Sequence, residues 1–259
     1  MIRLSYPFSE KAIRALKAGE AVSITGRIYT GRDKFHKFFA DGGKLPVDFR
    51  DGALYHCGPV VIRDANLTIE QAEQSNNYSV VAAGPTTSVR ENPYEPDFIA
   101  KSGVRIIIGK GGMDAKTLAA MKKHGCVYVQ AVGGGGAIYA DAVKKVAGVS
   151  MLGEFGAAEA VWHLDVVDFR GVVAMDAHGC SLFDAVRETS QKVVSSLVTT
   201  AFGHLGDWAS ERFPFFGIDI LWYYNKKNRR APFRSAAVFG ASHPPTYTST
   251  YTYLTPCAG

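Results

Sequence analysis

The sequence predicts an α/β protein in which neighbouring strands run parallel, followed by a tail of different composition. Between residues 78 and 146, strand-like runs alternate with helical segments of about 10–12 residues, the pattern of repeated βα units. The run Ile106–Ile108 is apolar throughout, as expected of a buried strand. After residue 202 the composition shifts towards aromatic residues and proline. These observations indicate an ordinary folded body and an appended tail.

The first part of the body is expected to begin with a helix and to continue with strands. The expected elements are a helix over 9–18, a strand over 21–30, a loop and short helix over 31–43, a strand over 54–63 and a polar surface connection over 64–77. Ser9 can cap the first helix, because its hydroxyl can accept a hydrogen bond from a free backbone N–H, and Gly19 ends that segment. Gly58 and Pro59 interrupt the second strand.

The second part of the body shows the clearest alternation of strands and helices. The expected strands cover 78–84, 104–109, 126–132, 160–169 and 171–177, and the expected helices cover 93–103, 114–125, 137–146 and 181–202. The helix over 93–103 carries a proline at its start and Gly103 at its end, where each residue is favoured.

The composition is that of a globular protein with a mild positive charge. Apolar residues make up 47% and charged residues 20%, and 29 Lys and Arg against 24 Asp and Glu give a formal net charge of +5. No run of Lys or Arg carries this charge, so we expect no nucleic-acid partner. No apolar stretch approaches about 18 residues, so we expect no membrane span.

Cysteine spacing and the N-terminal residues predict a cytoplasmic protein. The four cysteines, at 57, 126, 180 and 257, are too far apart in sequence for a CxxC pair. We therefore expect reduced thiols and no metal site in this chain. The N-terminal segment lacks the apolar core of a secretory signal.

The three loops with the most polar chemistry each follow a predicted strand. They cover 30–37, 84–90 and 109–113. In α/β sheets, ligands bind beyond the carboxyl ends of strands, so we expect these loops to form the site. The first loop contains Arg32, Asp33, His36 and Lys37. Its arginine could bind a carboxylate through two parallel hydrogen bonds, although a solvated, charged helix start is the alternative.

The second loop places three hydroxyls, from Thr86, Thr87 and Ser88, before Arg90 at the mouth of an apolar strand. Hydroxyls and a guanidinium in one loop favour an anion site, and ordinary helix capping is the alternative.

The third loop places Lys110 between glycines at the end of a buried strand. This is not a nucleotide P-loop, because that motif needs Ser or Thr directly after the lysine and Gly111 stands there. A simple turn with an exposed lysine is the alternative.

Other features offer little chemistry. The glycine run 133–136 fails the dinucleotide pattern, because Ile138 occupies the position of a required glycine, so a nucleotide-binding domain is only a minor alternative. The scattered histidines are interpreted as structural; they are His56, His124, His163 and His178.

Three cations remain, and they suit a substrate with two or more carboxylates; they are Arg32, Arg90 and Lys110. No metal ligands and no activated nucleophile accompany them, so this chain lacks an electrophile.

Four motifs in order resemble the β subunit, or C-terminal domain, of the class I fumarase and L-tartrate dehydratase family of iron–sulfur hydro-lyases. They are GRIYTGRDxxHK at 26–37, AGPTTSxR at 83–90, GKGGM at 109–113 and LGExGxxEAVW at 152–162. The similarity covers roughly residues 1–200. Each motif is weak alone, but their order is specific.

The resemblance implies a swivelling β/β/α domain with a mixed, partly parallel sheet over 1–202. Residues 203–259 match no part of the family, and we expect them to form a tail with little fixed structure. The resemblance also implies a separate α subunit that holds a [4Fe–4S] cluster with one open iron as a Lewis acid. The enzyme would then be a hetero-oligomer such as α2β2, active only with its partner.

The resemblance also assigns roles to residues of the three loops. The implied substrate-binding residues are Arg32, Thr87, Arg90 and Lys110, and the implied catalytic residues are Thr86, Arg90 and Lys110. Thr86 matches the hydroxyl that transfers a proton at carbon, and a neutral threonine would need help from Lys110 or Arg90 because it is a poor base. Asp33 and His36 are expected to support Arg32.

The motifs favour fumarate as the substrate, with reversible hydration to L-malate. Gly31 precedes Arg32 as in fumarases, whereas tartrate dehydratase β subunits often have Cys there. Ser88 and Val89 depart from the Ala-Gly of fused fumarases, and L-tartrate and mesaconate stay open as alternatives. An alternative of another class is a non-catalytic module that binds organic acids.

Overall fold

The computed structural model of the protein describes residues 1–63, 68, 71 and 77–194. The described residues fall into two units, divided between Ala185 and Val186. A helix over 182–194 crosses this division and confirms that much of the helix predicted over 181–202. The predicted boundary at 202, the tail over 203–259 and most of the connection over 64–77 lie outside the described residues.

The first unit is built on a mixed sheet. Within the described residues this sheet has seven strands in the order β1-β2-β3-β6-β7-β9-β8. The strands are β1 (Ile2–Ser5), β2 (Ala21–Thr30), β3 (Ala53–Tyr55), β6 (Ile106–Gly109), β7 (Val127–Gln130), β8 (Val143–Ser150) and β9 (Val161–Met175). The neighbours from β1 to β7 are parallel, whereas β9 runs antiparallel to β7, β8 and β2. The predicted α/β class with a mixed, partly parallel sheet is confirmed.

The long strand β9 closes this sheet on itself. It pairs with β7 through Tyr128 and Met175 and with β2 through Ile24 and Phe169. The strands β2, β3, β6, β7 and β9 therefore form a ring, in which the space inside is filled by side chains.

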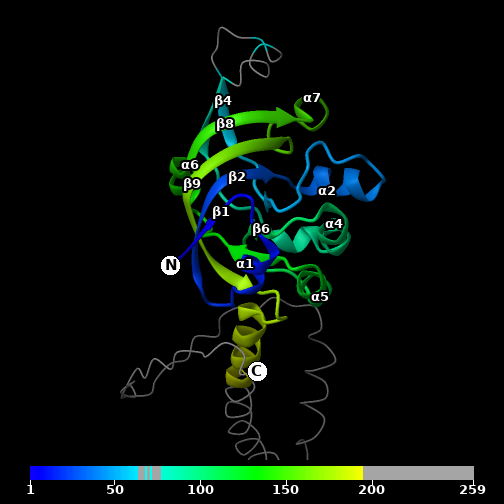
Figure 1. Cartoon of the computed structure of the whole chain (residues 1–259), viewed down its shortest axis with the longest axis vertical. Coiled ribbons are helices and arrows are strands. Elements are labelled where there is room, and N and C mark those ends of the chain that lie inside the picture. Colours follow the sequence, from blue (N-terminus) through cyan, green and yellow to red (C-terminus); the bar gives the residue numbers. More distant parts are fainter. Residues whose placement is uncertain (64–67, 69–70, 72–76, 195–259) are drawn as a thin grey trace, which may run out of the picture. The chain divides into compact units, whose positions relative to one another are not determined.

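The central strands are apolar because both of their faces are covered. Ile106 and Ile108 of β6 belong to the core inside the ring, and Ile107 belongs to a second core outside it. This follows from the alternation of side chains along a strand. Helices α2 (Asp33–Ala40), α4 (Glu95–Ser102) and α5 (Ala115–His124) lie along one side of the sheet in Figure 1, and α6 (Gly136–Ala142) lies on the other.

Capping residues set the helix ends. Helix α1 (Glu10–Arg14) starts after Ser9, whose Oγ accepts a hydrogen bond from the backbone N–H of Ala12 at 3.3 Å. Gly103 ends α4 with a φ of 70°, in the left-handed region that favours glycine. The helices predicted over 9–18, 31–43, 93–103 and 114–125 are confirmed, with α1 shorter than expected. No described helix is long and apolar enough to cross a membrane.

Four predictions about strands and helices are corrected. The strand predicted over 54–63 is two strands in separate sheets, β3 in the main sheet and β4 in a hairpin, with Gly58 and Pro59 between them. Residues 143–146 do not extend a helix, because Val143 begins β8 and pairs with β9. The predicted strands 160–169 and 171–177 are one strand, β9. The strand predicted as buried at 78–84 is β5 (Tyr78–Ala82), which pairs with β4 (Val60–Arg63) in a separate hairpin. Its residues are not fully buried, since they lie in this two-stranded sheet and not in the main one.

The loop after β5 returns to the main sheet through backbone contacts. Pro85 bridges to Cys57, and Thr87 bridges to Lys110 at the end of β6. A short 3-10 helix, η1 (Ser88–Glu91), follows. Close packing at this point needs a glycine, since a Cβ atom on Gly109 would lie 2.0 Å from Ser88 Oγ.

We therefore expect Gly109→Ala to destabilise the fold by about 1–3 kcal/mol, because the added methyl group must displace the Ser88 loop. Gly153→Ala is the matched control, since a Cβ there meets nothing within 4 Å. Urea unfolding of both variants measures the difference. Equal stability of the two variants would contradict this packing.

Candidate functional site

The three polar loops contact one another at the carboxyl ends of the parallel strands. The N–H of Ser88 donates to the Lys110 carbonyl at 3.0 Å, and the N–H of Lys110 donates to the Thr86 carbonyl at 3.2 Å. The second and third loops are thereby joined as short strand-like neighbours. The Arg90 guanidinium lies 3.2 Å from the Asp33 carboxylate, which joins the second loop to the first.

The pair of Arg90 and Asp33 is half exposed, with 46% and 45% of the two side chains accessible. Exposed ion pairs of this kind contribute little to stability, so the guanidinium can exchange partners at small cost. The partner of Asp33 in this structure is Arg90. The sequence predicts instead that Asp33 supports Arg32.

The Arg32 guanidinium is directed towards another segment. It donates to the Ala158 carbonyl at 3.2 Å and lies 3.4 Å from Glu159 Oε1. Gly58 makes room for it, because a Cβ at that position would lie 2.4 Å from Arg32 Nη1. Both partners belong to the fourth motif of the sequence, so the structure links the first motif to the last.

The hydroxyl groups and the lysine differ in exposure. The side chain of Thr87 is exposed, Thr86 and Lys110 are partly buried, and Ser88 is buried. Within the described residues, Lys110 forms no ion pair. A partly buried ammonium without a carboxylate partner is suited to binding an anion from solution.

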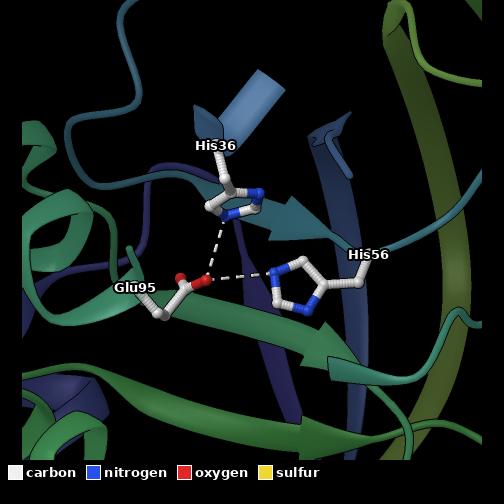
Figure 2. Close-up of side chains that lie close together, drawn as sticks. All are labelled: His36, His56 and Glu95. Carbon is white, nitrogen blue, oxygen red and sulfur yellow. Dashed lines mark ion pairs between the residues drawn. The ribbon is translucent and has the colours of Figure 1, made fainter. Parts of the chain in front are cut away.

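Behind these loops lies a buried cluster of His36, His56 and Glu95, shown in Figure 2. Glu95 Oε2 lies 3.0 Å from His36 Nε2 and 3.3 Å from His56 Nε2, and all three side chains are fully buried. His36 comes from α2, His56 follows β3, and Glu95 begins α4. The cluster thus connects three elements that carry or adjoin the polar loops.

Each imidazole is also held through its other nitrogen. His36 Nδ1 lies 3.0 Å from the carbonyl oxygen of Arg32, and His56 Nδ1 lies 2.9 Å from Ser88 Oγ. Ser88 Oγ in turn lies 2.9 Å from the hydroxyl of Tyr128. His36 therefore contacts the backbone of Arg32 and not its guanidinium, and the cluster orients the loop backbones.

Without a metal ion, burial and the charges of neighbouring residues set the protonation of each side chain in this cluster. Burial alone would raise the pKa of Glu95, but the charges of the two histidines hold that pKa at about 2. Burial opposes a charge on His36, yet Glu95 and Glu91 outweigh it and raise the pKa of His36. Burial lowers the pKa of His56 and raises that of Glu91 to about 8. Opposite charges then compensate one another in the interior.

Sequence reasoning missed this arrangement. The sequence predicts a structural role for His56 and points to no role for Glu91 or Glu95. A signal was present, because a charged or ionisable side chain inside an apolar segment must find a partner when buried. Sequence alone does not show which partner it finds.

Two of the described cysteines, Cys57 and Cys126, are buried. Burial raises the pKa of Cys57 to about 12 and also raises the pKa of Cys126, so both are neutral thiols, whereas iron–sulfur ligands are thiolates.

A groove of about 640 Å³ lies elsewhere on the first unit. Its lining is largely apolar and includes Met1, Val132, Ile138, Tyr139, Val167 and Val172. It contains none of the predicted site residues, so we do not assign it to dicarboxylate binding.

Comparison with known proteins identifies the family of this chain. The family model described as Fumarase C-terminus matches residues 1–186. A relative from Geobacillus stearothermophilus, named fumarate hydratase class I, is 47% identical over 202 residues, which are 78% of this chain and 37% of the relative. The chain thus spans well under half of that relative.

Two further relatives carry the name L(+)-tartrate dehydratase subunit beta. The protein from Methanocaldococcus jannaschii is 35% identical over 203 residues, covering 75% of this chain and 99% of the relative. The protein from Escherichia coli is 28% identical over 181 residues, covering 69% of this chain and 85% of the relative. The family match over most of the chain and these relatives show that the protein belongs to the Fumarase C-terminus family, which includes the β subunits of class I fumarase and tartrate dehydratase type hydro-lyases.

Proposed function

We propose that this chain is the β component of an iron–sulfur-dependent hydro-lyase, and that its reaction is the reversible hydration of fumarate to L-malate. The observation that carries the proposal is the meeting of three cation-bearing loops at one end of the parallel strands. A substrate with two carboxylates has the charge to engage more than one of these cations.

The site residues would act mainly through charge. Removing a proton next to a carboxylate transfers negative charge onto that carboxylate. Arg90 and Lys110 can stabilise this charge more strongly in the transition state than in the ground state, which lowers the barrier. Arg32 and Thr87 would hold and orient the other carboxylate.

Thr86 is the proposed site of proton transfer at carbon. Its backbone carbonyl accepts a hydrogen bond from the N–H of Lys110, so the two residues are adjacent. The hydroxyl needs a neighbouring cation to favour loss of its proton, and Lys110 and Arg90 are the candidates.

The remaining chemistry would come from a partner. A [4Fe–4S] cluster on an α subunit would supply the Lewis acid that assists departure of the hydroxyl group. The names of the tartrate dehydratase relatives, which are β subunits, support such a partner. We propose a hetero-oligomer such as α2β2 in the cytoplasm.

The choice of substrate rests on similarity. The relative named fumarate hydratase has the higher identity, 47% against 35% for the Methanocaldococcus relative. L-Tartrate is the second candidate, favoured by the two relatives named tartrate dehydratase, and mesaconate is the third.

We expect the chain alone to be inactive and to gain hydro-lyase activity on anaerobic co-expression with an α subunit that carries the cluster cysteines. The reason is that the described part of the chain supplies cations to the site but no electrophile that the substrate could reach. The measurement is fumarate absorbance during interconversion with malate. Turnover by the isolated, iron-free chain would show that the electrophile lies within it.

In the assembled enzyme, we expect fumarate and L-malate to be better substrates than either tartrate enantiomer or mesaconate. Measuring kcat/KM for each compound on one preparation decides among them. A higher kcat/KM for L-tartrate would replace fumarate as the proposed substrate while leaving the reaction class unchanged.

We expect Arg90→Ala to lower kcat/KM by a factor on the order of 10²–10³, because a cation aimed at the developing charge is lost. Arg170→Ala is the matched control, since Arg170 is an exposed arginine that pairs with Asp168 outside the site. Thermal unfolding of both variants tests whether the fold is intact. A near-normal rate in a folded Arg90→Ala enzyme would remove Arg90 from the site.

A further inference from the structure

We propose that His36, His56 and Glu95 bind a divalent transition-metal ion, with Zn²⁺ the best match, in a structural site behind the polar loops. This inference goes beyond the proposed function and does not rest on it. It concerns an ion held by this chain alone, whereas the sequence predicted no metal site here.

The first observation is a group of buried polar atoms that lack hydrogen-bond partners. Within the described residues these include His36 Nε2, His56 Nε2 and both carboxylate oxygens of Glu95. Buried polar atoms are nearly always paired, because an unpaired one has lost its hydrogen bonds to water and gained none in return. The two Nε2 atoms and one Glu95 oxygen lie within 4.8 Å of one another, so a single ion between them could contact all three.

The second observation is the direction of the two imidazole rings. Both Nε2 atoms lie within 3.3 Å of Glu95 Oε2, at ion-pair distance, but neither has the geometry of a hydrogen bond to it. An imidazole N–H that donated a hydrogen bond to this carboxylate would point at its oxygen. Ligands that share an ion each point at the ion and not at one another, and ligand atoms about 2.0–2.2 Å from a tetrahedral ion lie roughly 3.3 Å apart.

The third observation concerns the opposite nitrogen of each ring. A carbonyl oxygen can only accept, so His36 Nδ1 must donate its proton to Arg32 O. His56 Nδ1 can donate to Ser88 Oγ in the same way. Such bonds fix the tautomer that leaves Nε2 with a free lone pair, the arrangement usually found behind metal-ligating histidines.

The donor set selects the class of ion. Two imidazole nitrogens and one carboxylate suit Zn²⁺, whereas Mg²⁺ and Ca²⁺ prefer oxygen ligands. Both oxygens of Glu95 are free of hydrogen bonds, so a bidentate carboxylate would complete four donors. All three side chains are fully buried, so substrate cannot reach the ion and its role would be structural.

The ion would connect the loops of the candidate site. His36 lies one helical turn after Arg32, His56 contacts Ser88, and Glu95 follows η1, which carries Arg90. Binding free energy gained only in the folded state adds to stability, so loss of the ion should loosen these loops.

The test measures metal in the full chain, expressed alone without an affinity tag that binds metal. After gel filtration in a chelator, elemental analysis should find about one Zn²⁺ per chain, and less than about 0.1 in His36→Gln and His56→Gln. His163→Gln is the matched control, because His163 bonds Ser150 outside the cluster. Less than about 0.1 transition-metal ion in the wild-type chain, or full retention in both variants, would overturn the proposal.

A second measurement covers the case in which the variants do not fold. The wild-type chain is produced in minimal medium with Co²⁺, and its absorption spectrum is recorded. Intense visible bands of a tetrahedral ion without a sulfur-to-cobalt band would support the site. A sulfur-to-cobalt band would show that a cysteine binds the ion. Absence of bound Co²⁺ would show that His36, His56 and Glu95 hold no metal ion. Either outcome overturns the proposal.

Discussion

The structure depends on one constraint, that its central parallel strands are buried on both faces. Ile107 packs outside the ring of strands, while Ile106 and Ile108 pack inside it. Polar side chains therefore have no place along these strands and can gather only where the strands end. Because parallel strands end at the same edge, the loops with Arg32 and Lys110 lie there, and the loop with Thr86 joins them from the β4–β5 hairpin through backbone contacts with Cys57 and Lys110.

Burial of charge imposes a second constraint on the same region. Glu95 is fully buried at the start of α4, and a carboxylate in that position must be compensated by nearby cations or hydrogen bonds. His36 and His56 are the groups that face it. Compensation of this single carboxylate therefore fixes the relative positions of α2, α4 and the segment after β3, and with them the loops in front.

Most helices and the parallel strands were predictable because their signals are local. Ser9 and Gly103 act on the chain next to them, and a strand of three isoleucines has few alternatives to burial. The prediction of a helix over residues 143–146 is wrong, because the spacing of their apolar residues fits both a helix and a strand. Pairing with β9 makes them part of a strand. The burial expected for β5 was wrong for the same reason, since its partner β4 leaves it in a two-stranded sheet.

The sequence by itself determined the fold class, the existence of most helices, the family and which loops carry hydroxyls and cations, because motif order and local pattern need no knowledge of contacts. Only the tertiary structure decided that Asp33 pairs with Arg90, that Arg32 turns towards Glu159, and that two separate histidines share one carboxylate. Those contacts join residues far apart along the chain. They form only when the strands pair and close the ring, so no local pattern encodes them.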